Sequence, residues 1–89
     1  MKVRLELFGS SRDFSDKDYL ELEVQDKASM DDLRNEIIKY IDKNFQGNEN
    51  FIKVVKSSAF CSENNEIISD NYKITKDQKI GIIPPIGGG

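Results

Sequence analysis

The sequence contains no histidine, and it has a single cysteine, Cys61. Without histidine the chain cannot form a Ser-His-Asp triad or a metal site with imidazole ligands. One cysteine cannot close an internal disulfide or supply a cysteine-rich zinc cluster. We therefore expect no metal site in this chain. Any chemistry must use carboxylates, lysines or a partner protein.

Long hydrophobic runs are also absent from the sequence. The segment MKVRLELFG at its start alternates charged and apolar residues and fits neither a signal peptide nor a membrane span. Together with the single cysteine, this predicts a reduced, cytoplasmic protein that does not act at a membrane. The net charge is −3, and lysines alternate with acids instead of forming a basic stripe. This charge pattern argues against a nucleic-acid partner.

The first half of the chain shows two regular patterns. Residues 2 to 8 and 19 to 24 alternate polar and apolar side chains, which predicts two half-buried strands joined as a hairpin by a polar connection. From residue 30 to about 44 the apolar residues recur every three or four positions, which predicts a helix. Ser29 is its expected N-cap, and Gly47 suits its end.

The second half is expected to be mostly extended. FIKVVK (51 to 56) has the composition of a strand, and SSAFC (57 to 61) is a second strand or its continuation. KIGII (79 to 83) is a final apolar strand that Pro84 and Pro85 must end. We therefore predict an α+β fold of 89 residues, with a mixed sheet of four to five strands packed on one main helix. Residues 1–83 form this domain, and 84–89 form an extended tail.

The tail PPIGGG has three parts. Pro84 and Pro85 favour an extended exit from the sheet. Ile86 can anchor on a partner surface, while Gly87, Gly88 and Gly89 have no Cβ and can pass through a channel too narrow for side chains. The α-carboxylate of Gly89 can be activated as an acyl-adenylate and then attacked by a nucleophile. The simpler alternative is a frayed terminus without function.

Three segments carry a resemblance to a known family: LFGSSRD with Phe8, Arg12 and Asp13; ASMDDLRNEI with Leu33 and Arg34; and the ending from Ile83 to Gly89. The chain resembles the ubiquitin-like β-grasp sulfur carriers, and most closely the small subunits of molybdopterin synthase. The resemblance spans nearly the whole chain, although only the C-terminal motif is highly specific. The chain departs from the family at Gln78-Lys79, where an acidic pair is common, and at Gly87, which replaces Ser or Thr.

The resemblance implies a role in molybdenum cofactor biosynthesis. A ubiquitin-activating-type adenylyltransferase would adenylate Gly89 using ATP and magnesium, and a sulfur donor protein would convert it to a thiocarboxylate. The tail would then enter the large synthase subunit, where sulfur passes to the pterin precursor. This chain would bind no cofactor itself and would act as the non-catalytic, sulfur-donating subunit of a hetero-oligomer. Candidate partner-binding residues are Phe8, Arg12, Ile83, Pro84, Pro85 and Ile86.

Several interpretations stay open from the sequence. The chain could carry sulfur for thiazole synthesis or a similar pathway, or it could be a ubiquitin-like modifier whose Gly89 ends in an isopeptide bond. It could also be a binding module with inert glycines. Single residues have simpler interpretations too: Cys61 as a small buried side chain, Phe8 as a packing residue, and Arg12 as a solvated one.

Overall fold

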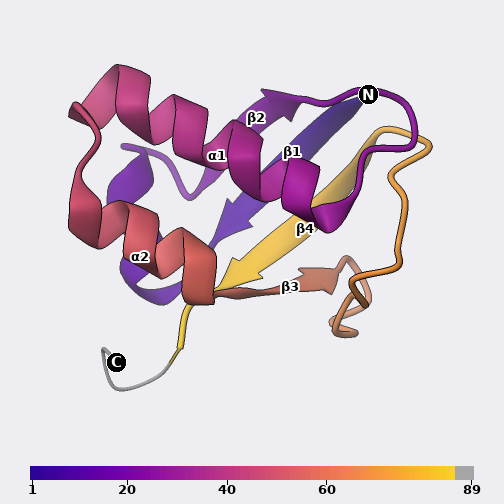
Figure 1. Cartoon of the computed structure of the whole chain (residues 1–89). Helices are drawn as coiled ribbons and strands as arrows, with labels where there is room; N and C mark the ends of the chain where they lie inside the picture. The colour runs from indigo at the N-terminus through magenta and orange to yellow at the C-terminus, as the bar shows by residue number, and fades with distance from the viewer. Residues whose placement is uncertain (86–89) are drawn as a thin grey trace.

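The chain forms a four-stranded mixed sheet with two α-helices on one of its faces (Figure 1). The computed structural model describes residues 1–85, so the predictions for Ile86, Gly87, Gly88 and Gly89 lie outside it. The strand order is β2-β1-β4-β3. Central strand β1 (Lys2–Leu7) runs antiparallel to β2 (Tyr19–Glu23) and parallel to β4 (Gln78–Ile83), and β3 (Ala59–Ser62) runs antiparallel to β4. The predicted α+β class is confirmed.

The predicted hairpin of the first two strands is also confirmed. Leu5 pairs with Leu20 and Val3 with Leu22, which places the apolar side chains of both strands on the helix side of the sheet. The connection between them is more ordered than its polar sequence indicated. It contains a 3₁₀ helix, η1 (Gly9–Phe14), whose last residue, Phe14, is fully buried.

Helix α1 (Met30–Phe45) covers the sheet, as its periodicity predicted. Ser29 caps its start: the Ser29 Oγ accepts the Asp32 N–H at 3.1 Å, and the Asp32 carboxylate accepts the Ser29 N–H at 2.9 Å. At the other end Gln46 adopts a left-handed conformation, followed by Gly47 at a φ of 70°. The buried stripe of α1 consists of Met30, Leu33, Ile37 and Ile41.

The strand predicted for residues 51 to 56 is wrong, because this segment lies in a second helix, α2 (Glu49–Ser57). A short apolar run rich in β-branched residues fits a strand and a buried helix equally well. Here an N-cap favours the helix, because the Asn48 side chain accepts hydrogen bonds from the backbone N–H groups of Asn50 and Phe51. In the helix Val55 is fully buried, and Phe51 packs against the core.

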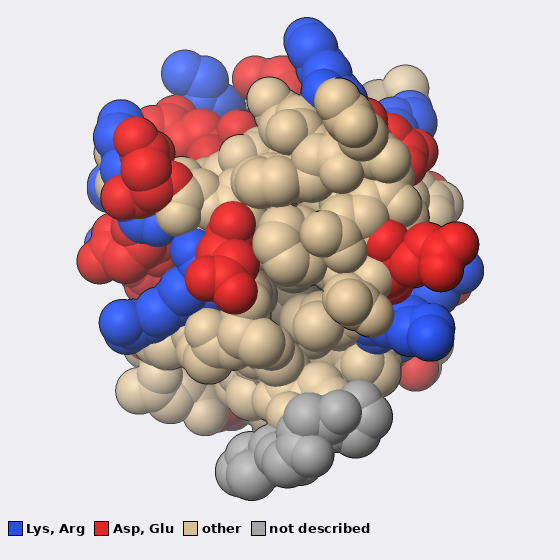
Figure 2. Space-filling model, turned by 90° about the vertical axis from the view of Figure 1, so that its left-hand side faces the viewer, with Lys and Arg blue, Asp and Glu red and all other residues tan. Residues whose placement is uncertain are grey.

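An aromatic cluster joins η1 to both helices. The rings of Phe14 and Phe51 lie 5.1 Å apart between centroids, and so do those of Phe45 and Phe51. Tyr40 on α1 donates a hydrogen bond to the Phe14 carbonyl at 2.6 Å, and burial followed by the nearby Asp16 charge raises the pKa of Tyr40. Figure 2 views this end of the molecule, where an uncharged area is bordered by charged side chains. The cluster fixes η1, and with it the chain that leaves β1.

The capping box of α1 gives a testable dependence of stability on pH. The Ser29 backbone N–H, followed by the Ser29 side chain, lowers the pKa of Asp32. The resulting stability is present above the unfolded-state pKa of about 3.9 and is lost as the pH falls through the lower folded-state pKa. We expect Asp32→Asn to lower the free energy of unfolding near neutral pH, and the difference from wild type to shrink in acid. Urea titrations at several pH values measure this difference.

Asp31→Asn serves as the matched control, because Asp31 lies in the same helical turn but makes no hydrogen bond to Ser29 among the described residues. A pH-independent difference between Asp32→Asn and wild type would contradict this account of the cap.

Candidate functional site

The sheet has a second face that neither helix covers (Figure 1). Side chains alternate along a strand, and Val3, Leu5 and Leu7 point toward the helices. The intervening residues of each strand therefore point the other way, to what we call the outer face. On this face the strand pairing sets Glu6 beside Gly81 and Gly81 beside Cys61, and an isolated bridge adds Ile67 beside Cys61.

The large hydrophobic residues that are exposed within residues 1–85 gather on this outer face. They are Phe8 at 43%, Ile67 at 68% and Ile83 at 37% exposure. Ile83 pairs with Ala59, one row along the sheet from the Gly81–Cys61 pair. Together with Ala59, Cys61 and Gly81 on the same face, these three residues form what we call the outer apolar surface. Clustered exposed apolar residues of this kind indicate a protein–protein contact site.

The other half of the outer face is polar. Arg4 and Lys79 are paired neighbours on β1 and β4, and both are exposed. The Arg4 guanidinium lies 3.8 Å from the centroid of the Tyr19 ring on β2, in cation–π contact. The apolar half therefore has a charged border along the row of the sheet that contains Arg4 and Lys79. A partner that covers the apolar half can be oriented by this border.

Phe8 is held in place by its own backbone contacts. The Ser11 Oγ accepts the Phe8 N–H at 2.9 Å and donates to the Phe8 carbonyl at 2.6 Å, and Ser11 is fully buried. Gly9 follows at a φ of 56°, a backbone conformation that residues other than glycine rarely adopt. This turn directs the chain into η1 while the Phe8 side chain stays on the outer face.

The exit of the chain from β4 lies against the same turn. Pro84 is buried, and a Cβ at Gly9 would lie 3.8 Å from the Pro84 Cγ. Ile83 just before it is exposed on the outer face, and Pro85 just after it is exposed. The predicted end of the strand at Pro84 is confirmed. The structure thus brings Phe8, Ile83 and Pro84 together at one end of the sheet.

The other predicted site residues are placed differently. Arg12 is exposed on η1, and among residues 1–85 it forms no ion pair. Its predicted partner contact stays a prediction. Cys61 is a free thiol, 6% exposed, which agrees with its interpretation as a small buried side chain. Ile67 was missed, although the Ile67-Ile68 pair after a turn carried a signal, because neighbouring residues of an extended segment point to opposite faces.

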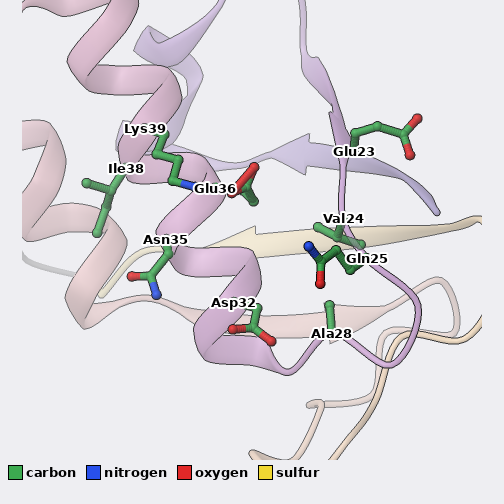
Figure 3. A pocket seen from close by; sticks show the side chains of 9 residues that line it. All are labelled: Glu23, Val24, Gln25, Ala28, Asp32, Asn35, Glu36, Ile38 and Lys39. Atoms are coloured by element: carbon green, nitrogen blue, oxygen red, sulfur yellow. Dashed lines mark ion pairs between the residues drawn. The ribbon is translucent and has the colours of Figure 1, made fainter.

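A large hollow lies elsewhere, between α1 and the segment after β2 (Figure 3). It has a volume of about 800 Å³, and its charged lining residues are Glu23, Asp32, Glu36 and Lys39. All three carboxylates already have partners: Glu23 binds the Met1 amino group at 3.1 Å, Asp32 caps α1, and Glu36 pairs with Lys39 at 3.0 Å. We therefore do not assign the functional site to this hollow.

Two classes of site find no support in the described part of the chain. Residues 1–85 contain no group of three or more metal-ligating side chains that could hold a metal ion. Within the same range, no helix has the length and apolar character needed to cross a bilayer.

Solved structures with this fold are known. A Pyrococcus furiosus protein with the provisional name molybdopterin converting factor, subunit 1, matches with a TM-score of 0.68 and 23% identity, over 96% of this chain and 98% of the other. SAMP1 from Haloferax volcanii matches with a TM-score of 0.67 and 13% identity, over 100% of both chains. The chain has the ubiquitin-like β-grasp fold. No family model and no curated protein matches its sequence.

The opposite orientation of Ile67 and Ile68 gives a direct test of the outer apolar surface. Ile67 is 68% exposed, so Ile67→Ser should change the free energy of unfolding by less than about 0.5 kcal/mol. Ile68 packs against the core, so Ile68→Ser should lower it by about 1–2 kcal/mol. Urea denaturation of both variants measures the contrast. If Ile67→Ser also lowered the free energy of unfolding by about 1–2 kcal/mol, Ile67 would be part of the core and not of a contact surface.

Proposed function

We propose that the chain is a sulfur carrier of molybdenum cofactor biosynthesis, acting as the small subunit of molybdopterin synthase. The observation that carries the proposal is the position of the outer apolar surface beside the exit of the tail: Ile83 belongs to this surface, and Pro84 is the next residue. A partner that covers Phe8 and Ile83 would lie where the chain leaves the sheet. The β-grasp fold and the C-terminal motif support the same function.

The proposed chemistry takes place at Gly89. An oxygen of its carboxylate attacks the α-phosphorus of ATP, and pyrophosphate leaves. Hydrosulfide (HS⁻) supplied by a sulfur donor protein then attacks the carbonyl carbon, the bond from this carbon to the phosphate oxygen breaks, and AMP and a proton leave. The product is a thiocarboxylate, whose sulfur is the nucleophile toward the pterin precursor in the large subunit. Magnesium and ATP belong to the activating enzyme in this scheme.

The chain's own contribution is binding and presentation. It has no histidine, and its described carboxylates at the large hollow serve the cap and ion pairs. The outer apolar surface would dock first on the activating enzyme and later on the large subunit, so the two contacts exclude each other. The chain would therefore have to dissociate from the activating enzyme before it could bind the large subunit.

The two alternatives that share this chemistry differ in the acceptor. A carrier for thiazole synthesis would form the same thiocarboxylate, whereas a ubiquitin-like modifier would transfer its Gly89 acyl group to a lysine amine. The Pro84-Pro85 pair before the glycines favours the molybdenum pathway by resemblance. Covalent conjugates on other proteins in cells would instead identify a modifier.

We expect the chain to gain sulfur at Gly89 when it is incubated with a ubiquitin-activating-type adenylyltransferase, ATP, magnesium and a sulfide source. Trypsin cleavage after Lys79 releases residues 80 to 89, which contain no cysteine, so alkylation of this peptide reports the thiocarboxylate apart from Cys61. Peptide mass spectrometry before and after iodoacetamide measures the product. A chain lacking Gly89 is the control. An unmodified peptide with several such adenylyltransferases would contradict the proposal.

A further inference from the structure

Gly81 lies in the middle of β4, between Glu6 on β1 and Cys61 on β3. A glycine inside a strand lowers stability, because it has no side chain to pack and loses more backbone entropy than other residues. The usual conformational reason for glycine does not apply here, since the glycines with positive φ among residues 1–85 are Gly9 and Gly47. The reason for glycine at this position must therefore be the space around it.

That space is occupied by two side chains of the outer apolar surface. A Cβ built on Gly81 would lie 2.9 Å from the Phe8 Cε2 and 2.8 Å from the Cys61 Sγ. Carbon and sulfur atoms without a bond do not approach this closely, so the ring or the thiol would have to move. Gly81 itself is buried, and the exposure of Cys61 is 6%, although both lie on the face that the helices leave open. The Phe8 ring lies against Gly81, and the Cys61 thiol lies next to the same position.

We propose that Gly81 is a positioning residue of the docking surface: its missing side chain provides the seat on which the Phe8 ring lies, beside the Cys61 thiol. Phe8 is 43% exposed, so part of the residue is packed while the rest is available to a partner. The Ser11 contacts fix the Phe8 backbone, and the Gly81 seat fixes its side chain. The role of this seat in partner docking rests on the proposed function.

A seated ring lowers the cost of docking. A side chain that is already fixed loses little conformational freedom when a partner covers it, whereas a displaced and rotating ring must be ordered first. With the ring displaced, the partner would also meet a raised and irregular surface between Phe8 and Ile83. Gly81 thus affects docking without contacting the partner itself.

The seat can be tested in the chain alone, because Cys61 is its sole cysteine and reports on the ring beside it. We expect Gly81→Ala to raise the rate of Cys61 alkylation by iodoacetamide several-fold, toward the rate of Phe8→Ala. Lys79→Ala, a change on the same strand and the same face, is the control and should leave the rate unchanged. Thermal denaturation of each variant separates a moved ring from general unfolding.

The effect on docking is measured by ATP–pyrophosphate exchange with the adenylyltransferase, using the chain as substrate. Gly81→Ala should raise KM for the chain about 2- to 12-fold, the range expected for ordering one side chain, and leave kcat unchanged. In the Phe8→Ala background the same substitution should have no further effect on KM, because the ring that it would displace is absent.

The alkylation rate and KM test different parts of the proposal, so each part can be contradicted without the other. Unchanged Cys61 alkylation in a folded Gly81→Ala variant would overturn the seat. Faster alkylation with unchanged KM, or equal effects of Gly81→Ala with and without Phe8, would overturn its role in docking. If the wild-type chain supports no exchange, the proposed function fails, while the alkylation rates still decide whether Gly81 seats the ring.

Discussion

The parallel pairing of β1 with β4 in the centre of the sheet determines where the rest of the structure lies. Parallel strands end at the same side of a sheet, so the residues that follow Leu7 and those that follow Ile82 emerge together. Phe8 and Ile83 therefore face outward at one end, and Gly9 meets Pro84. Segments that are more than 70 residues apart in the sequence become one surface. Both helices pack on the opposite face, which leaves this surface open.

This arrangement joins two properties that the sequence shows separately. The tail has residues suited to extended, narrow passage, and the outer apolar surface has residues suited to protein contact. Because Ile83 belongs to the surface and Pro84 is the next residue, a partner on the surface would lie beside the point where the chain leaves the sheet. The β-grasp fold alone does not specify this use, since one fold hosts many functions.

Much of the fold could be predicted from the sequence, because its signals are local. Alternation predicted β1 and β2 close to their observed bounds, and the apolar run before Pro84 predicted β4. The Ser29 cap and the apolar stripe after it predicted α1. The strand predicted for residues 51 to 56 was wrong, because the composition of this segment fits a strand and a helix equally well. The Asn48 cap, which the prediction did not use, favours the helix. The role of Gly81 could not be assigned from the sequence, because it comes from the positions of Cys61 and Phe8 across the sheet, whereas the Ile67-Ile68 pair carried a signal that was missed.

We propose that the outer apolar surface, and not the large hollow beside α1, contacts the activating enzyme. Hydrogen–deuterium exchange of the chain alone and in complex with the adenylyltransferase tests it most directly. We predict slower exchange at residues 8 to 9, 59 to 62 and 78 to 83 in the complex, with α1 unchanged. Slower exchange confined to α1 and residues 23 to 28, around the hollow of Figure 3, would contradict the account.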